Sequence, residues 1–433
     1  MRKIFAGSAS IIFKILAILL LSGCATPNVF FFEKIAQPNI HEPRKGTKVV
    51  SVHIDAHGSL YPDSGYPARF EPTKKDVGSL QNMSIQKSKD ETWVYDRLCL
   101  ASTTGQAAKL CKNALEGTWK SAQSTLWQEK ASQILDSFST NSKDRTLVFL
   151  IHGFNVPAGG ESGSFAIARE RIKRLTTSET EIVYVEVNWD GFALRPGNRA
   201  WSSAQSSGPL VGFKMRELFN SISAQSKTKN LPEPKIRILG HSSAAFIVGA
   251  AFGNPIGALP NLQKANPNKD PGYWDFYQER TAVPHIDDLR IGIAAAATSS
   301  LTYAGFQKPC KLDAEKCKEM GLLTRGSTLV LTLNPYDMVL IKKFGIENLS
   351  LAGATGVGAS KSTFCEVETS DRLAKSNINV IGLDFIRDTE LKDYKKSHSF
   401  SVYLTQEQSA DFLQILMGEK EVSDHEIKDC FTE

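Results

Sequence analysis

The stretch TLVFLIHGFN, residues 146–155, decides the fold. Five apolar residues run unbroken into His152 and Gly153. An apolar run of this length is typical of a strand that is buried on both faces of a parallel sheet. Gly153 then permits a tight turn and a close approach of the backbone to a ligand. We therefore predict a buried strand that ends at a turn suited to binding.

A second unit of the same kind lies downstream. An apolar strand over 235–239 leads into the pentapeptide GHSSA at 240–244, and the pattern predicts a helix over 244–252. A turn that exposes a serine between a strand and a helix requires small neighbours, because larger side chains clash where the backbone doubles back. The usual motif is Gly-x-Ser-x-Gly, so Ala244 is a departure from it. The two units together predict two tight turns at neighbouring strand ends.

Strands and helices alternate around these two units. The patterns predict strands over 49–54, 181–187, 289–295, 328–333 and 378–383, and helices over 119–138, 162–176, 209–223 and 405–417. This alternation is the signature of βαβ units, in which helices cover both faces of a parallel sheet. We therefore predict an α/β fold with a mostly parallel central sheet over about 145–418. Long insertions at 253–285, 298–324 and 343–375 interrupt it, and loops of this length are functional or disordered.

The bulk composition is that of a globular protein, with 41% hydrophobic and 22% charged residues. The length of 433 residues suits one large domain with insertions or two ordinary domains. The net charge is +5, and Arg2, Lys3 and Lys14 lie in an acid-free N-terminal segment, which leaves +2 for the remainder. The chain contains no dense basic cluster, so we predict no nucleic-acid partner.

The N-terminus has the pattern of a secretory signal. Two basic residues precede the apolar run 11–21, which is too short for a membrane-spanning helix. The tetrapeptide LSGC at 21–24 resembles the lipobox of bacterial lipoproteins. This resemblance implies a signal peptide over 1–23, lipidation of Cys24 and a proline-rich tether over 24–46. It also implies attachment to a membrane surface in the cell envelope, at the outer membrane of a Gram-negative host. A plain signal peptide or an uncleaved anchor is the alternative.

The remaining cysteines form an even set, which in an exported chain predicts disulfides rather than free buried thiols. The chain contains no Cys-x-x-Cys motif, so the sequence gives no sign of a zinc or redox motif. Sequence proximity favours two pairs and leaves a third, namely Cys99–Cys111, Cys310–Cys317 and Cys365–Cys430.

Four segments resemble the α/β-hydrolase superfamily, and in particular a bacterial group of esterase/lipase-like serine hydrolases of unknown function. They are HGFN at 152–155, GHSSA at 240–244, NPYD at 334–337 and HSF at 398–400. The chain order Ser, Asp, His is the order that this superfamily uses. The resemblance implies an α/β-hydrolase domain within 47–433.

The resemblance also implies roles for single residues. Ser242 corresponds to the nucleophile, His398 to the general base and Asp337 to the acid that orients the imidazole. The backbone N–H groups of Phe154 and Ser243 correspond to the donors that bind the oxyanion of an acyl intermediate. Asp384 also closes a predicted strand and is the rival candidate for the acid.

The other histidines have simpler interpretations. His152 braces the oxyanion turn or is itself catalytic, and His241 is structural. His53 and His57 flank Asp55 at even spacing, which places His53 and Asp55 on one face of a strand, but too few further ligands are found, so we predict no metal.

Two further features concern ligands. The glycines at 353–358 match neither phosphate-binding pattern, and we predict no cofactor. The aromatic residues at 273–277 line an acyl pocket, form a lid, or only pin their own loop.

The resulting hypothesis is a membrane-anchored serine hydrolase that cleaves carboxylic esters, lipid or acyl, through an acyl-enzyme. One alternative is a non-catalytic envelope lipoprotein on the same scaffold, because fold does not determine function. Another is an acyltransferase with the same triad. The sequence does not distinguish ester, amide and thioester substrates.

Overall fold

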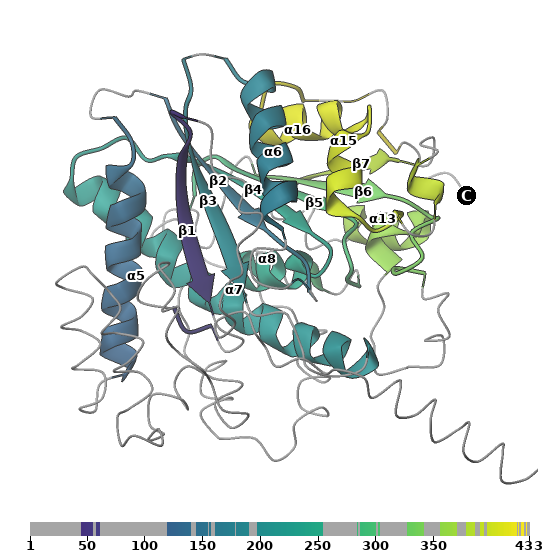
Figure 1. The fold of residues 1–433 in the computed structure, drawn as a ribbon, viewed down its shortest axis with the longest axis horizontal. Coiled ribbons are helices and arrows are strands. Elements are labelled where there is room, and N and C mark those ends of the chain that lie inside the picture. Colours follow the sequence, from purple (N-terminus) through teal and green to yellow (C-terminus); the bar gives the residue numbers. More distant parts are fainter. Residues whose placement is uncertain are drawn as a thin grey trace, which may run out of the picture.

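Seven parallel strands form one sheet in the structure, which is a computed structural model (Figure 1). Their order across the sheet is β1-β3-β2-β4-β5-β6-β7. The strands are β1 (Lys48–Ile54), β2 (Arg145–Ile151), β3 (Glu181–Trp189), β4 (Lys235–His241), β5 (Leu289–Ala294), β6 (Thr328–Leu333) and β7 (Asn379–Asp384). The α/β fold predicted from the apolar runs is confirmed.

The structure describes part of the chain. The described residues are 45–54, 58–60, 119–139, 144–154, 156, 161–177, 179–189, 197–253, 284, 286–299, 302–303, 327–341, 356–369, 378–385, 390–393, 396–421, 423, 426–427 and 430.

Helices cover both faces of the sheet, as Figure 1 shows. One layer contains α5 (Trp119–Asp136), α7 (Gly197–Thr228), α8 (Ala244–Phe252) and α13 (Lys361–Glu368). The other contains α6 (Ser162–Leu175), α15 (Phe400–Thr405) and α16 (Ser409–Met417). Two short 3-10 turns, η2 (Gly356–Gly358) and η3 (Glu390–Lys392), lie in connections. None of the described helices combines the length and apolarity that crossing a membrane requires.

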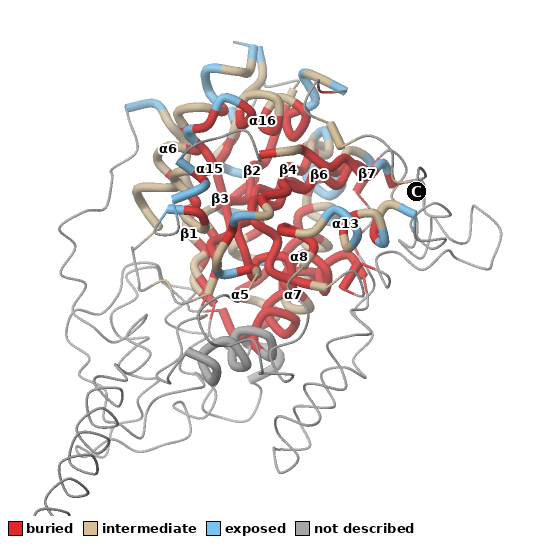
Figure 2. Tube along the Cα trace, turned by 90° about the vertical axis from the view of Figure 1, so that its right-hand side faces the viewer, coloured by how far each residue is buried: buried red, intermediate tan, exposed pale blue. Residues whose placement is uncertain are grey.

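The central strand β2 shows why an unbroken apolar run marks the middle of the sheet. Successive side chains of a strand point to opposite faces. Leu147, Phe149 and Ile151 pack in the cluster beneath α5, α7 and α8, whereas Val148 and Leu150 pack against the layer of α6 and α16. All of β2 is buried, and Figure 2 shows that the neighbouring strands β3 and β4 are mostly buried.

The two turns predicted from the sequence lie at one place in this topology. From β2 the chain passes through α6 to β3 on one side, and from β4 it passes through α8 to β5 on the other side. The direction of winding therefore reverses between the adjacent strands β2 and β4. Ligands of open α/β sheets bind at the carboxyl ends of the strands at such a reversal.

Two helix predictions need correction. Helix α7 begins at Gly197, so Pro209 lies inside it rather than in its first turn. A β-carbon at Gly208 would lie 2.9 Å from the β-carbon of Phe246, so α7 passes close to α8 here, and packing outweighs local propensity. The helix predicted over 405–417 begins only at Ser409, as α16: Thr405 is instead the last residue of the separate helix α15, and Gln408 precedes α16 without a side-chain cap.

The sequence patterns did not predict α13, which lies inside the insertion over 343–375. Cys365 of this helix forms a disulfide with Cys430, and their α-carbons are 5.3 Å apart. The predicted pair is confirmed. Beside it, the N–H of Ile427 donates to the carbonyl of Gly382 in β7 at 2.8 Å, so the C-terminal segment is tied to the edge strand.

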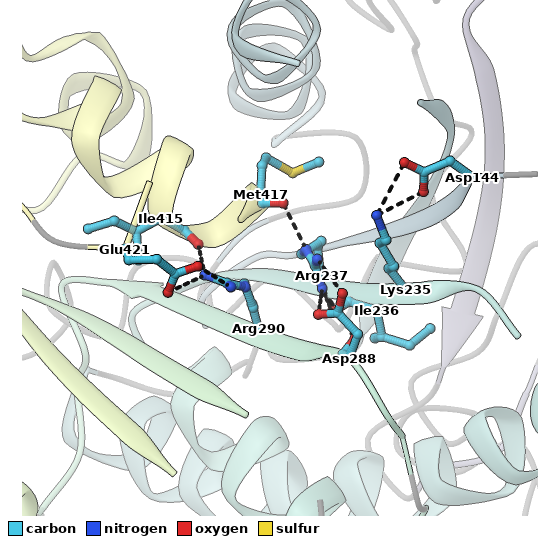
Figure 3. Close-up of polar contacts among 9 residues, drawn as sticks. All are labelled: Asp144, Lys235, Ile236, Arg237, Asp288, Arg290, Ile415, Met417 and Glu421. Carbon is cyan, nitrogen blue, oxygen red and sulfur yellow. Dashed lines mark hydrogen bonds and ion pairs between the residues drawn. The ribbon is translucent and has the colours of Figure 1, made fainter. Parts of the chain in front are cut away.

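Two arginines attach α16 to the amino ends of β4 and β5 (Figure 3). Arg237 binds both carboxylate oxygens of Asp288, at 2.7 and 3.1 Å, and its Nε donates to the carbonyl of Met417 at 3.3 Å. Arg290 donates to the carbonyl of Ile415 at 3.1 Å. These carbonyls lie in the last turn of α16, where the regular helix hydrogen bonds run out, although Ile415 also accepts from the capping N–H of Gly418 at 3.1 Å. We call Arg237, Asp288 and Arg290 the arginine clamp.

Candidate active site

Ser242 occupies the turn between β4 and α8 with a positive φ of 55°. A positive φ is uncommon for a residue other than glycine and persists only where the surroundings enforce it. Here the N–H of Ser242 donates to the carbonyl of Ala294 at 2.9 Å, and its own carbonyl accepts from Ala245 and Ala297 at 3.2 Å each. The serine is therefore held on a strained turn at the carboxyl end of the sheet.

Small residues make this turn possible. A β-carbon at Gly240 would lie 3.0 Å from that of Ala244 and 2.8 Å from Cδ1 of Ile293. The departure from Gly-x-Ser-x-Gly is accommodated because the residue facing the Ala244 methyl group is a glycine. The turn after β2 comes equally close to the serine turn, since a β-carbon at Gly153 would lie 3.0 Å from the β-carbon of Ser242.

Three side chains that are distant in the sequence meet at this turn. The Nε2 of His398 lies 2.8 Å from Oγ of Ser242, and its Nδ1 lies 2.8 Å from Oδ2 of Asp337. Both distances are within hydrogen-bonding range for a nucleophile, a base and an orienting acid. Ser242 is 1% exposed and the His398 side chain 17%, so the histidine forms the accessible edge of the site.

Asp337 is fully buried and its carboxylate is bound by four donors. Oδ1 accepts from the N–H groups of Val339 and Leu340 at 3.1 and 3.2 Å, and Oδ2 accepts from His398 and from the Tyr403 hydroxyl at 3.3 Å. Donors of this kind stabilise a charged carboxylate in a buried position. The Nδ1 of His398 bonds to Asp337, so the rival acid Asp384 does not occupy this place.

The supporting roles of Tyr403 and two further buried residues were not predicted from the sequence, although one of them, Asn334, belongs to the NPYD segment. Burial and the adjacent Asp337 raise the pKa of Tyr403 well above its ordinary value, so the phenol keeps its proton and donates it. The Nδ2 of Asn334 donates to the carbonyls of Leu391 and Ser397 at 3.3 Å each, and the hydroxyl of Ser397 accepts from the N–H of Met338 at 3.2 Å. These bonds hold the loop bearing His398 against the loop bearing Asp337.

His152 braces the turn after β2, and its hydrogen bonds define its tautomer. Its Nε2 accepts from the backbone N–H of Trp189 at 3.2 Å, so Nδ1 carries the proton and donates to the carbonyl of Gly153 at 2.6 Å. Burial lowers the pKa of His152 to about 4, and the ring is neutral at neutral pH. Of the two interpretations of His152, these bonds support the bracing role.

The oxyanion donors expected from the sequence lie on the two turns that converge. Phe154 directly follows Gly153, and Ser243 directly follows Ser242 and is fully buried at the start of α8. A β-carbon at Gly153 would also lie 3.3 Å from the carbonyl oxygen of His241. The backbones that carry the two N–H groups are thus brought together beside the serine.

Glu161, which was not predicted from the sequence, adds a second carboxyl group near His398. It immediately precedes α6, at the end of the loop that follows β2. Burial raises its pKa, whereas a hydrogen bond from Ser164 and the proximity of His398 act in the opposite direction.

Several predicted features lie outside the described residues. They are Cys24 with the signal peptide and nearly all of the tether, Cys99–Cys111, Cys310–Cys317, the aromatic residues at 273–277, Asp55 and His57. Among the residues that the structure does describe, one group has the geometry of cation ligands, Cys365, Glu368 and Cys430. Its two sulfur atoms are joined in the disulfide and are not thiolate ligands.

The chain was also compared with known proteins. No protein-family model matches it, and no curated protein matches it either. A function for this chain must therefore be argued from its own residues and their geometry.

Proposed function

We propose that this chain is a serine hydrolase that cleaves carboxylic esters through a covalent acyl-enzyme. The observation that carries the proposal is the unbroken series of hydrogen bonds from Ser242 through His398 to Asp337, each 2.8 Å long. A serine hydroxyl is a poor nucleophile until a base accepts its proton, and this series supplies the base and the group that orients it.

The positions of these groups support the following reaction. The Oγ of Ser242 attacks the ester carbonyl while Nε2 of His398 takes the hydroxyl proton, and Asp337 stabilises the imidazolium. The N–H groups of Phe154 and Ser243 bind the oxyanion of the tetrahedral intermediate. His398 then gives its proton to the leaving alcohol as the C–O bond breaks. Water, deprotonated by His398, attacks the acyl-enzyme and releases the carboxylic acid and free Ser242.

The architecture supports membership of the α/β-hydrolase superfamily. The serine lies on a strained strand-to-helix turn with positive φ, which is the nucleophile arrangement of that superfamily. The acid follows β6, and the histidine follows β7 and precedes the last helices, in the chain order Ser, Asp, His.

The proposed location and substrate class depend on the N-terminal motif. The resemblance of LSGC at 21–24 to a lipobox supports attachment through lipidated Cys24 to a membrane of the cell envelope. Such an anchor favours lipid or acyl esters as substrates, and in a Gram-negative host the outer membrane as the location. An acyltransferase would use the same triad with an alcohol or amine in place of water, and analysis of the products separates the two.

A fluorophosphonate probe tests the proposal because it labels only an activated serine. We expect labelling of the folded protein, loss of labelling in Ser242→Ala, and full labelling in the control Ser132→Ala, whose serine lies on α5 away from the site. Hydrolysis of p-nitrophenyl esters of increasing chain length then defines the acyl preference. Correctly folded protein that is not labelled would reject the enzyme in favour of a non-catalytic envelope protein.

A further inference from the structure

His241 is the last residue of β4 and directly precedes the nucleophile. Its Nε2 lies 3.0 Å from the backbone carbonyl oxygen of His398. Because a carbonyl oxygen only accepts hydrogen bonds, Nε2 must carry the proton and donate it. One strand therefore supplies the serine and, from the adjacent residue, a hydrogen bond to the backbone of the base.

The His241 ring contacts several parts of the site. It stacks on Phe400 with ring centroids 4.9 Å apart and an angle of 12°, and it lies 5.0 Å from the ring of His398. A β-carbon at Gly153 would lie 3.3 Å from its Nδ1, so its other edge faces the turn after β2. His241 is 6% exposed. The imidazole thus lies between the base, the start of α15 and the oxyanion turn.

The environment also keeps the His241 ring neutral, with the proton on Nε2 available for the hydrogen bond to the carbonyl of His398. Burial first, and then the proximity of His398, lower the pKa of His241 well below its ordinary value. The ring is therefore neutral at the pH at which a histidine base works. The Nδ1 has no hydrogen-bond partner among the described residues. Within that part of the chain, the ring therefore makes a single hydrogen bond, which goes to the backbone carbonyl of His398.

We propose that His241 is a positioning residue, which sets the distance between Ser242 and His398 by holding the backbone of the base from the nucleophile strand. This inference rests on the proposed function. A loop that carries a catalytic base must be held to within a fraction of an ångström, because a misplacement of 1 Å costs about a hundredfold in rate. Any movement of the His398 backbone away from β4 breaks the hydrogen bond to His241.

A pair of substitutions at position 241 separates positioning from packing. His241→Gln retains an N–H donor, and His241→Met has a similar length without one. We expect His241→Met to lower kcat for a p-nitrophenyl ester by about tenfold or more with KM little changed, and His241→Gln to recover most of kcat. The rate of fluorophosphonate labelling should fall and recover in parallel. Thermal unfolding of both variants shows whether they are folded.

The outcomes discriminate between the two proposals. Equal kcat in the two folded variants, whether normal or reduced, would overturn the positioning role, because the donor would then be irrelevant. Wild-type protein that is neither labelled nor active would instead reject the proposed hydrolase. If His241→Met does not fold, a normal kcat in His241→Asn, whose amide is too short to reach the carbonyl, would equally overturn the role.

Discussion

Gly240 and Ala244 face each other across the turn that carries Ser242, and a β-carbon at Gly240 would lie 3.0 Å from the Ala244 methyl carbon. The motif therefore needs one glycine of this pair but not both. The missing second glycine does not count against a nucleophile turn in this chain, because the alanine is accommodated by its partner.

The close approach of Gly240 and Ala244 predicts the effect of a substitution at each position. Gly240→Ala should lower the free energy of unfolding by roughly 1–3 kcal/mol and slow labelling of Ser242, because the turn must open to admit the methyl group. Ala244→Gly should keep labelling and cost at most about 1 kcal/mol as a glycine in α8. Urea unfolding and labelling rates measure both effects.

The double variant provides the control. Gly240→Ala with Ala244→Gly should recover part of the loss but not all of it, because Ile293 also lies within 2.8 Å of the new methyl group. Strictly additive losses would show that the two positions do not interact.

The acid of the triad can be identified by matched substitutions of the two candidates. Asp337→Asn should lower kcat by about 10⁴-fold, because the amide no longer holds the imidazole in the required tautomer or stabilises its charge. Asp384→Asn should keep near-normal kcat, because the Nδ1 of His398 bonds to Asp337. Initial rates with a p-nitrophenyl ester measure both variants. A large loss in Asp384→Asn alone would reassign the acid.

The buried His152 predicts a loss of stability on acidification. Its pKa is about 4 in the folded chain and about 6.5 when unfolded, so between these values the unfolded state binds more protons. The free energy of unfolding therefore falls as pH decreases from about 6.5 to 4, by roughly 3 kcal/mol for this group. Protonation would set a second N–H against the donor N–H of Trp189. Urea unfolding at pH 7 and pH 5 measures the loss.

The variant His152→Asn supplies the comparison, since an amide side chain does not titrate. We expect a lower stability at pH 7 and a smaller difference between the two pH values than in the wild type. The same pH dependence in both proteins would show that other groups cause the acid sensitivity.

The fold was predictable wherever burial leaves a periodic signal. The run 147–151 identified a central strand because both of its faces are apolar, and the strand over 235–239 was identified although Arg237 lies within it. Helix α13 was not predicted, because its eight residues lie in a long insertion and its capping residue, Ser360, is one of several serines there. The full length of α7 was not predicted, because its close packing on α8 outweighs the helix-breaking tendency of Pro209 within it.

The candidate site was predictable only in part, and for a different reason. Ser242, Asp337 and His398 were identified by resemblance to short motifs. Asn334, Ser397 and Tyr403 support them through single polar atoms buried among apolar residues, and one polar residue creates no periodic pattern. Their partners are set by tertiary packing, which no local sequence pattern reveals.

The arginine clamp determines the stage of folding at which the candidate site forms. It seats α16 on β5 and on β4, the strand whose far end leads into the serine, and the histidine lies on the segment before that helix. A chain that has assembled its strands but not yet docked α16 possesses a nucleophile without its base. Under the proposed function, hydrolysis can therefore begin only after the last helix has docked on the sheet.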